Sequence, residues 1–439
     1  MRAPGALFSG IDFARHRTVL AAVSGGGDSL ALLFLLHEHL RTIASGPSLL
    51  AVTVDHGLRA GSAGEAREVG RLAAAHGIAH RVLNWEGGKP ASGLSAAARE
   101  ARLALLARAA REAGAGLVFT GHTADDQAET LAMRLARGGG RGAAGIAPAT
   151  LVDGGVWFLR PLLGTRRATL RAFLRERGIS WMEDPSNHDP RFERARIRAA
   201  LDETAIGELL AAARTAAEAR ERLGLEAAGL IEAAAERAAP GLLRVPLEAL
   251  AGSEAGLYAF RILLAVVGGA EHLPDLNRAA ALLGRAGEQG FRATLSGAAV
   301  TARRGDVYFH RERRNLPASP AADGTLWDGR YRIAVRESLP EGTLAAFGAE
   351  NARTAELPAT DAPRGLVRAA LAAEPALHAG GPLVGLAASL PQVSIEPVPG
   401  PWARLLPSFD LAPAGAVAAL LGAREIPPSP WEGHKRAMG

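Results

Sequence analysis

The chain has 439 residues, enough for two or three domains with separate hydrophobic cores. It contains no cysteine, which excludes disulfide bonds, thiolate metal sites, iron–sulfur clusters and persulfide chemistry. Its formal net charge is +5, and its only lysines are Lys89 and Lys435. This arginine-rich composition can reflect a polyanionic partner or a general compositional bias toward Ala, Gly and Arg, and the two explanations are equally good. No apolar run approaches the ~20 residues of a membrane span, and the first residues lack a signal-type apolar core, so we expect a cytoplasmic protein without membrane contact.

The first 137 residues alternate between apolar runs and helical patterns. We predict strands at 18–24, 49–56, 80–85 and 117–122, and helices at 29–42, 62–77, 95–112 and 124–137. This alternation is typical of βαβ units, which form a parallel sheet with helices on both faces. Ligands of such sheets bind beyond the carboxyl ends of the strands, so the polar segments that follow the strands are the candidate site.

The pattern changes after residue 137. We expect the glycine-rich stretch 137–145 to lead into a loop, followed by a helix at 166–177 and a polar stretch that ends in "RFERARIR". Residues 204–239 and two further segments read as helices, 290–312 alternates like strands, and a Pro- and Ala-rich linker begins at 316. We therefore predict a Rossmann-like α/β domain over 1–203, a mainly helical domain over 204–315 and a small mixed domain over 316–439.

The turn "SGGGDS" at 24–29 lies between the first strand and the first helix. Such a turn points backbone N–H groups and the positive end of a helix at an anion, although glycines can also serve only the backbone geometry. The Walker phosphate loop needs a lysine, which is absent here. The dinucleotide fingerprint needs a glycine three residues after Gly27, and this chain lacks one there. Because Asp28 would repel phosphate directly, a divalent cation between the two is the natural explanation.

Several motifs carry a resemblance to a known family. "SGGGDS" resembles the pyrophosphate loop of the N-type ATP pyrophosphatases (PP-loop family). Four further motifs, in the expected order, resemble the tRNA(Ile)-lysidine synthetases within it: "VDHGLRAGSAGEA", "GHTADDQAETLAMRLARGGGRGAAG", "RPLLGTRR" and "EDPSNHDPRFERARIR". The resemblance covers roughly the first 200 residues. Many members have a second histidine where this chain has Thr123.

The resemblance implies a two-step ligation on tRNA(Ile) with a CAU anticodon. ATP adenylates the carbon-2 oxygen of the wobble cytidine and releases pyrophosphate, and an amine of L-lysine then displaces AMP to give lysidine. ATP and Mg²⁺ are the implied cofactors, and tRNA and L-lysine are the implied partners. The sequence leaves open whether the protein is a monomer or a homodimer.

The resemblance also assigns roles to the residues of the glycine turn. Their N–H groups and hydroxyls are expected to hold the β- and γ-phosphates, with Asp28 placing the metal. The turn consists of Ser24, Gly25, Gly26, Gly27, Asp28 and Ser29. Asp55, His56 and Arg59 follow the second strand, where relatives hold adenosine and the α-phosphate; a polar strand-end turn would explain them equally well.

The acids of "TADDQAE" have two readings. Thr123 and Asp126 have the spacing of a capping box, which explains one acid of the cluster. Asp126 and Glu129 share a helix face and form a carboxylate pair suited to an ammonium group of lysine, as the resemblance also implies. We favour the α-ammonium as their ligand, with His122 near the reacting centre, and leave open which amine they hold.

The arginines of "RFERARIR" are candidate tRNA contacts. Arg194 and Arg198 are four residues apart, an arrangement that destabilises a bare helix unless an anion faces it. A solvated basic helix is the alternative, but the position after the catalytic domain favours contact with the tRNA backbone. The candidate tRNA residues are Arg191, Arg194, Arg196 and Arg198, with Arg99 and Arg102 as weaker candidates.

Two other functions are compatible with parts of the sequence. A catalytically inactive, nucleotide-dependent tRNA-binding protein would keep the turn and the arginines, but it would not need Asp126 and Glu129. Another adenylating PP-loop ligase acting on a small molecule would share the turn; amidation would also require an ammonia source, and a cysteine-dependent glutaminase is excluded.

Overall fold

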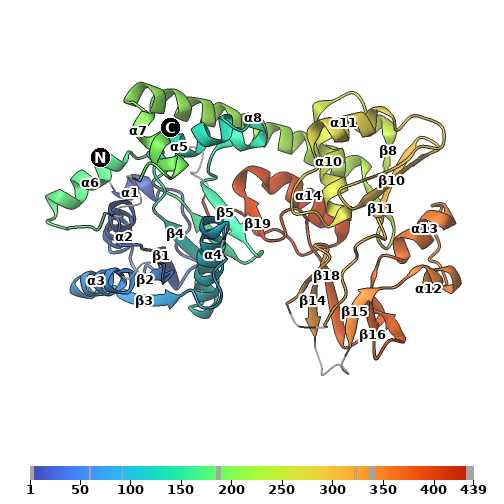
Figure 1. Cartoon of the computed structure of the whole chain (residues 1–439), viewed down its shortest axis with the longest axis horizontal. Coiled ribbons are helices and arrows are strands. Elements are labelled where there is room, and N and C mark those ends of the chain that lie inside the picture. Colours follow the sequence, from blue (N-terminus) through green and yellow to red (C-terminus); the bar gives the residue numbers. More distant parts are fainter. Residues whose placement is uncertain are drawn as a thin grey trace. The chain divides into compact units, whose positions relative to one another are not determined.

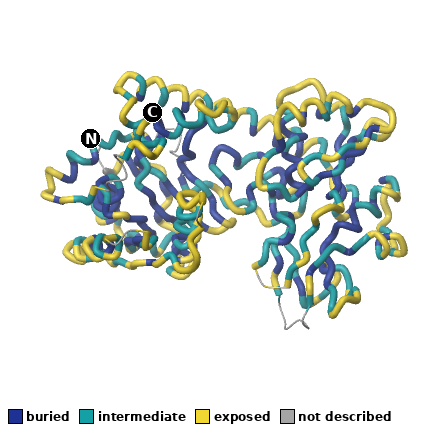
Figure 2. Tube along the Cα trace, viewed as in Figure 1, coloured by how far each residue is buried: buried dark blue, intermediate teal, exposed yellow. Residues whose placement is uncertain are grey.

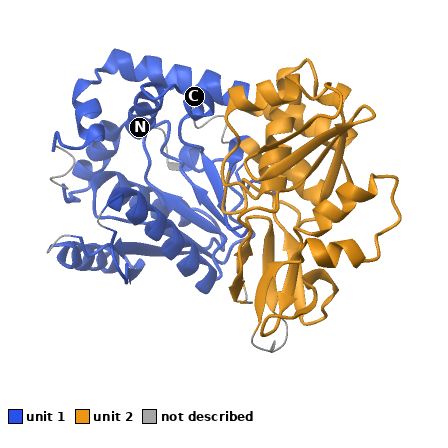
Figure 3. Cartoon of the chain, turned by 45° about the vertical axis from the view of Figure 1, so that its right-hand side comes forward, with its two compact units in different colours: residues 1–220, 407–409, 428–439 blue, residues 221–406, 410–427 orange. Residues whose placement is uncertain are grey.

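A computed structural model of the chain describes residues 4–58, 61–90, 92–183, 189–320, 322, 324–335 and 342–431. The chain divides into two compact units (Figure 3). Unit 1 comprises residues 1–220, 407–409 and 428–439, and unit 2 comprises 221–406 and 410–427. None of the described helices is both long enough and apolar enough to cross a membrane.

Unit 1 is built on a seven-stranded, mainly parallel sheet with the strand order β19-β5-β6-β4-β1-β2-β3 (Figure 1). Strands β1, β2, β3, β4 and β6 run parallel, and β5 pairs with β6 in the antiparallel sense. The strands are β1 (Thr18–Ala22), β2 (Ser48–Asp55), β3 (Ala79–Asn84), β4 (Leu117–Thr120), β5 (Ala149–Val152), β6 (Val156–Leu159) and β19 (Leu405–Pro407). The order reverses between β1 and β4, so the ends of these two strands border a crevice suited to a ligand.

Helices cover both faces of this sheet. Alternate strand residues such as Leu20 and Ala22 pack against Leu106 and Ala110 of α4, whereas the intervening residues Val19 and Ala21 are buried on the opposite face, where α2 packs. Figure 2 shows the resulting buried layer. The helices are α1 (Pro4–Leu7), α2 (Gly27–Leu40), α3 (Ser62–Ala75), α4 (Leu94–Glu112), α5 (Ala124–Leu135), α6 (Arg167–Glu176), α7 (Glu193–Ala200) and α8 (Glu203–Ala234), which continues into unit 2. The expected parallel α/β architecture of the first part is confirmed.

The segment after the glycine-rich stretch differs from the expected loop. It contains a short 3₁₀ helix at Gly140–Ala144 and then the β5–β6 hairpin. Both strands have four residues, which is too short for a periodic pattern, and the turn between them uses positive φ angles at Asp153 and Gly154. The apolar side chains of β6 are buried, which is why the hairpin extends the sheet at this edge.

Unit 2 combines helices with antiparallel sheets. Its first part holds a five-stranded sheet, β7-β8-β11-β10-β9, beside the end of α8 and three helices. The elements are β7 (Glu236–Ala239), β8 (Leu242–Pro246), α9 (Leu247–Leu250), α10 (Glu254–Gly268), α11 (Leu276–Gly284), β9 (Arg292–Leu295), β10 (Ala298–Arg303) and β11 (Asp306–Arg311). The helices expected between 204 and 287 are therefore accompanied by a sheet, and the strand pattern of 290–312 is confirmed.

The remainder of unit 2 holds a four-stranded sheet, β12-β15-β16-β17, and a three-stranded sheet, β13-β14-β18. A buried ion-pair network of Arg311, Asp328, Arg330 and Glu374 joins β11 to these later segments. The elements are β12 (Ser319–Pro320), β13 (Leu326–Trp327), β14 (Tyr331–Val335), β15 (Thr343–Ala346), α12 (Ala349–Thr354), α13 (Arg364–Leu371), β16 (Pro375–His378), β17 (Leu383–Leu386), β18 (Val393–Pro397) and α14 (Leu411–Leu421).

Candidate active site

The glycine turn joins β1 to the start of α2 and is held by its own hydroxyls. Ser29 Oγ accepts a hydrogen bond from the Ser24 backbone N–H at 3.1 Å and donates to the Gly26 carbonyl at 3.0 Å. Gly25 has φ +81°, a backbone conformation that strains any residue with a side chain, and the end of the Met182 side chain fills the space where a Cβ atom would lie. The turn is therefore packed into one shape by its neighbours.

Asp28 lies in the first turn of α2 and presents one free carboxylate oxygen. Its Oδ2 accepts a hydrogen bond from Arg167 Nε at 3.0 Å, while its buried Oδ1 has no partner among the described residues. Burial raises the pKa of Asp28, an effect that the nearby Arg167 guanidinium opposes. The strand end of β4 packs closely here, because a Cβ atom on Gly121 would lie 2.9 Å from the Asp28 carbonyl oxygen.

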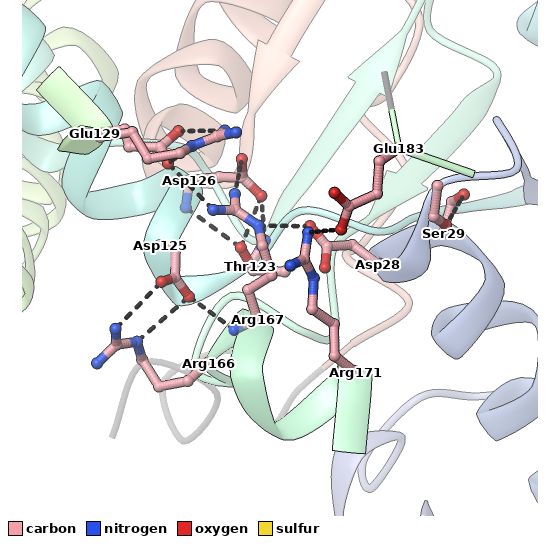
Figure 4. A network of polar contacts seen from close by, with 12 residues as sticks. Asp28, Ser29, Thr123, Asp125, Asp126, Glu129, Arg166, Arg167, Arg171 and Glu183 are labelled. Carbon is pink, nitrogen blue, oxygen red and sulfur yellow. Dashed lines mark hydrogen bonds and ion pairs between the residues drawn. The ribbon is translucent and has the colours of Figure 1, made fainter. Parts of the chain in front are cut away.

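Helix α5 begins with the predicted capping box. Asp126 Oδ2 accepts hydrogen bonds from Thr123 N and from Thr123 Oγ1, both at 2.8 Å, and Asp126 N donates to Thr123 Oγ1. The other oxygen, Asp126 Oδ1, accepts from Arg167 Nη2 at 3.1 Å and from Arg194 Nη2 at 3.0 Å. Asp126 thus caps its helix with one oxygen and faces the arginines with the other (Figure 4).

Glu129 lies one turn further along α5 and is almost fully buried, with 2% of the residue exposed. It accepts hydrogen bonds from Arg194 Nε at 2.7 Å, Arg198 Nε at 2.7 Å and Arg167 Nη1 at 3.3 Å. Burial raises the pKa of Glu129, but the hydrogen bonds from Arg198 and Arg194 outweigh burial and lower it. Glu129 is therefore ionised and neutralised by guanidinium groups.

The sequence alone assigns no role to Arg166 and Arg167, which lie at the start of α6. Burial opposes the charge of Arg167, but Asp126, Asp28 and Glu129 outweigh it and raise its pKa. Arg166 pairs with Asp125, which also accepts the Arg167 backbone N–H at 2.7 Å. Arg167 thus joins the acid of the glycine turn to the acids of α5. The "RPLLGTRR" motif was the only signal in the sequence for it.

His122 follows β4 and lines the same cavity. Thr120 Oγ1 lies 3.0 Å from its Nδ1. Burial, and then the positive charge of Arg160, hold the pKa of His122 well below its usual value, so the ring is neutral at neutral pH. A neutral imidazole can accept a proton or a hydrogen bond without repelling an ammonium group.

The end of β2 forms a separate polar group. Asp55 Oδ1 accepts the Gly57 backbone N–H at 2.8 Å, and a hydrogen bond with Ser62 lowers its pKa. The rings of His56 and Trp85 meet edge to face at 5.9 Å. Arg59 lies outside the described residues.

A cavity of about 430 Å³ is lined by about half of the candidate residues. Its walls come from the glycine turn, α4, the end of β4, α5, α6, α7 and the segment before residue 184. The lining residues are Ser24, Gly27, Asp28, Ser29, Arg102, Gly121, His122, Asp126, Arg167, Arg171, Trp181, Met182, Glu183, Arg194 and Arg198.

The other candidate residues lie apart from this lining. Glu129 does not line the cavity, but its hydrogen-bond partner Arg194 does. Asp55 and His56 do not line it either. Arg99 is exposed, Arg191 pairs with Asp189 in solvent, and Arg196 donates to the Pro190 carbonyl at 2.6 Å. The cavity brings the glycine turn together with Asp126, which shares Arg167 with the buried Glu129, an arrangement that suits a nucleotide and an amine.

The comparisons with known proteins point in the same direction. Residues 6–205 match the PP-loop domain family. The chain is 50% identical to tRNA(Ile)-lysidine synthase of Mesorhizobium japonicum, over 98% of this chain and 97% of the relative. It is 40% identical to the tRNA(Ile)-lysidine synthase of Brucella canis, over 95% of this chain and 98% of the relative, and to that of Brucella suis to the same extent.

Proposed function

The chain belongs to the tRNA(Ile)-lysidine synthase family, and from this membership we propose that it ligates L-lysine to carbon 2 of the wobble cytidine of CAU-anticodon tRNA(Ile). In the first step the carbon-2 oxygen attacks the α-phosphorus of ATP, and the bond to the β-phosphate oxygen breaks to release pyrophosphate. In the second step an uncharged amine of lysine attacks carbon 2, AMP leaves with the oxygen, and the amine loses a proton. The products are lysidine, AMP and pyrophosphate.

One observation carries this proposal: the glycine turn and Asp126 line a single cavity, where Arg167 pairs with Asp28, with Asp126 and with the buried Glu129. A nucleotide phosphate and an amine bound at these two places would be neighbours. Backbone N–H groups at the start of α2, together with the positive end of that helix, favour the β- and γ-phosphates. The polar residues after β2, with Asp55 and His56, would hold the adenosine side.

The residues present fit Mg²⁺ bound together with ATP. Mg²⁺ is commonly held by one or two carboxylates together with substrate phosphates, and it keeps several waters. Asp28 offers one buried oxygen without a partner in the described chain, and the described residues contain no cluster of three acids or histidines that would form an all-protein site. The metal would lower the negative charge on the phosphates, while Asp28 fixes its position.

Asp126 and Glu129 would hold an ammonium group of lysine. Their carboxylates are now paired with Arg167, Arg194 and Arg198, so an ammonium group would join or replace a guanidinium at these oxygens. Charge-assisted hydrogen bonds of this kind are the strong ones in proteins. His122, neutral and close to the end of β4, would face the reacting centre.

The arginine run would contact the tRNA backbone. Arg99 and Arg191 have exposed side chains that a phosphate can reach directly, whereas Arg194 and Arg198 face the cavity and could reach only a phosphate that enters it. Arg196 lies on the same helix. Such contacts position a nucleic acid without reading its sequence. A cytoplasmic location and a homodimer remain predictions.

The test is incubation of the protein with ATP, Mg²⁺, labelled lysine and a CAU-anticodon tRNA(Ile) transcript. We expect label in the tRNA, with AMP and pyrophosphate formed only when tRNA is present. A transcript with UAU in place of CAU lacks the target cytidine and should stay unlabelled. ADP as the main nucleotide product would contradict the adenylation step. Pyrophosphate release without lysine transfer would favour another adenylating PP-loop ligase, and tRNA binding without any turnover would favour an inactive binding protein.

A further inference from the structure

Arg171 is a cation of the cavity that no motif in the sequence singles out. It lies on α6, one turn after Arg167, and it is among the residues that line the cavity. Its Nη2 pairs with Glu183 Oε1 at 3.2 Å, and its guanidinium lies 5.8 Å from the centre of the Trp181 ring. Figure 4 shows the side chain beside Asp28 and Glu183.

The guanidinium of Arg171 keeps a donor unused. Its Nε is buried and has no hydrogen-bond partner among the residues that the structure describes. A buried N–H group of a charged side chain without a partner is costly, and an ordered water or a bound ion can complete such a group. An anion in the cavity would supply the missing acceptor.

The partners of Arg171 also touch the glycine turn. The segment 181–183 contains both Trp181 and Glu183, and its middle residue, Met182, donates its backbone N–H to the Gly25 carbonyl at 3.0 Å. A Cβ atom on Gly27 would lie 3.4 Å from the Trp181 ring. One short segment therefore holds Arg171 with an aromatic face and a carboxylate while it packs on the turn. This fixes the cation relative to the proposed phosphate site.

We propose that Arg171 binds the β- and γ-phosphates of ATP and the pyrophosphate that leaves, in the place where other phosphate loops use a lysine. The proposal rests on the adenylation reaction proposed above and adds a residue to it. When the bond between the α-phosphorus and the bridging oxygen breaks, the bridging oxygen keeps the electron pair and the pyrophosphate gains negative charge. A guanidinium fixed beside it stabilises that charge.

The test compares Arg171→Gln with Arg175→Gln, a matched control. Arg175 lies one turn further along α6 and also stacks on Trp181, at 5.6 Å, but it does not line the cavity. Calorimetric titration of the full chain with Mg²⁺ and pyrophosphate, a non-hydrolysable ATP analogue or AMP gives three affinities for each protein. We expect Arg171→Gln to weaken the binding of pyrophosphate and of the ATP analogue by about ten- to a hundredfold, the range for a lost charge-assisted hydrogen bond. The affinity for AMP should stay the same. Arg175→Gln should leave all three unchanged.

A separate measurement distinguishes nucleotide phosphate from tRNA phosphate. If Arg171 contacts the tRNA backbone instead, Arg171→Gln will weaken tRNA binding and leave pyrophosphate affinity unaltered, which overturns the proposal. Equal losses in both variants would also overturn it, because they would indicate a general effect on α6; melting temperatures of both variants identify misfolding. If the unaltered protein binds pyrophosphate through Arg171 but transfers no lysine, the ligase function fails while this assignment stands.

Discussion

Arg198 Nε lies 2.7 Å from Glu129 Oε1, and this carboxylate is almost fully buried. Removing one partner of a buried ion pair leaves the other charge uncompensated, at a cost of roughly 3–5 kcal/mol. We predict that Glu129→Gln lowers the free energy of unfolding by less than that amount, because its arginine partners are partly exposed, and that Arg198→Met costs much less in the Glu129→Gln background than alone. Urea denaturation of the four proteins of this double-mutant cycle measures the coupling. Additive effects would show that the pair contributes nothing to the fold.

The arginines of α7 and the preceding residues divide into an inner and an outer set. Arg194 and Arg198 bind acids of the cavity, whereas Arg191 and Arg196 lie outside it. If the inner pair contacts tRNA phosphates, its replacement with Ala weakens the binding of all tRNA sequences alike. The plot of log affinity against log salt concentration then becomes less steep, by about one unit of slope per lost phosphate contact. Filter binding over a salt series measures the slope, with the Arg191→Ala and Arg196→Ala double variant as the comparison. A slope that changes only in the outer variant would assign the inner pair to the active site alone.

Asp28→Asn removes the charge that is proposed to place the cation and keeps the shape of the side chain. We expect pyrophosphate formation to fall by at least ~100-fold, the scale of a lost electrostatic contact in a catalytic site, while the dissociation constant of tRNA stays nearly the same. Asp125→Asn is the control, because Asp125 is also paired with an arginine at the start of α6 but does not line the cavity. Comparable losses in both variants would count against a specific role for Asp28.

Asp126→Asn separates lysine binding from helix capping. Asparagine keeps an oxygen that can accept from Thr123, yet it cannot neutralise an ammonium group. We expect the lysine concentration for half-maximal incorporation to rise by about ten- to a hundredfold while adenylation of tRNA persists.

Thr123→Ala provides the opposite control for Asp126→Asn. It removes the capping hydroxyl and leaves the charge of Asp126, so it should lower the melting temperature without changing the lysine dependence. A lower melting temperature with an unaltered lysine dependence in Asp126→Asn would defeat the lysine assignment.

The low pKa of His122 predicts that the stability of the protein depends on pH. Its pKa in the folded protein is well below 6.5, so below pH 6.5 the unfolded chain binds a proton that the folded protein does not. Stability therefore falls as the pH drops, by up to about 1.4 kcal/mol per pH unit for this one group. Unfolding free energies at pH 7.5 and 5.5 should differ less in His122→Asn than in the unaltered protein. Parallel changes in both proteins would contradict the neutral state of the ring.

The sequence predicted the parallel sheet well because its central strands β1 and β4 are buried on both faces and its helices are long. The helix expected at 95–112 is observed at Leu94–Glu112, and the strand expected at 49–56 is observed at Ser48–Asp55. The family resemblance is confirmed by relatives that match nearly the whole chain. The motifs could not show that Arg167 joins Asp28 to the acids of α5, because these pairs connect residues 38 to 139 positions apart. Arg171 carries no local signal at all, since only the fold brings it beside the glycine turn.

The position of Gly121 affects how a mutational survey of this enzyme is interpreted. A side chain at this position would collide with the backbone of Asp28 and Ser29, and both residues belong to the glycine turn. Even alanine should therefore abolish activity in a selection, with the same score as a lost catalytic group, although glycine has no side chain to do chemistry. In a ranked list of sensitive positions, Gly121 would mark a close approach of two backbone segments. The reacting groups would have to be recognised by their response to conservative substitutions.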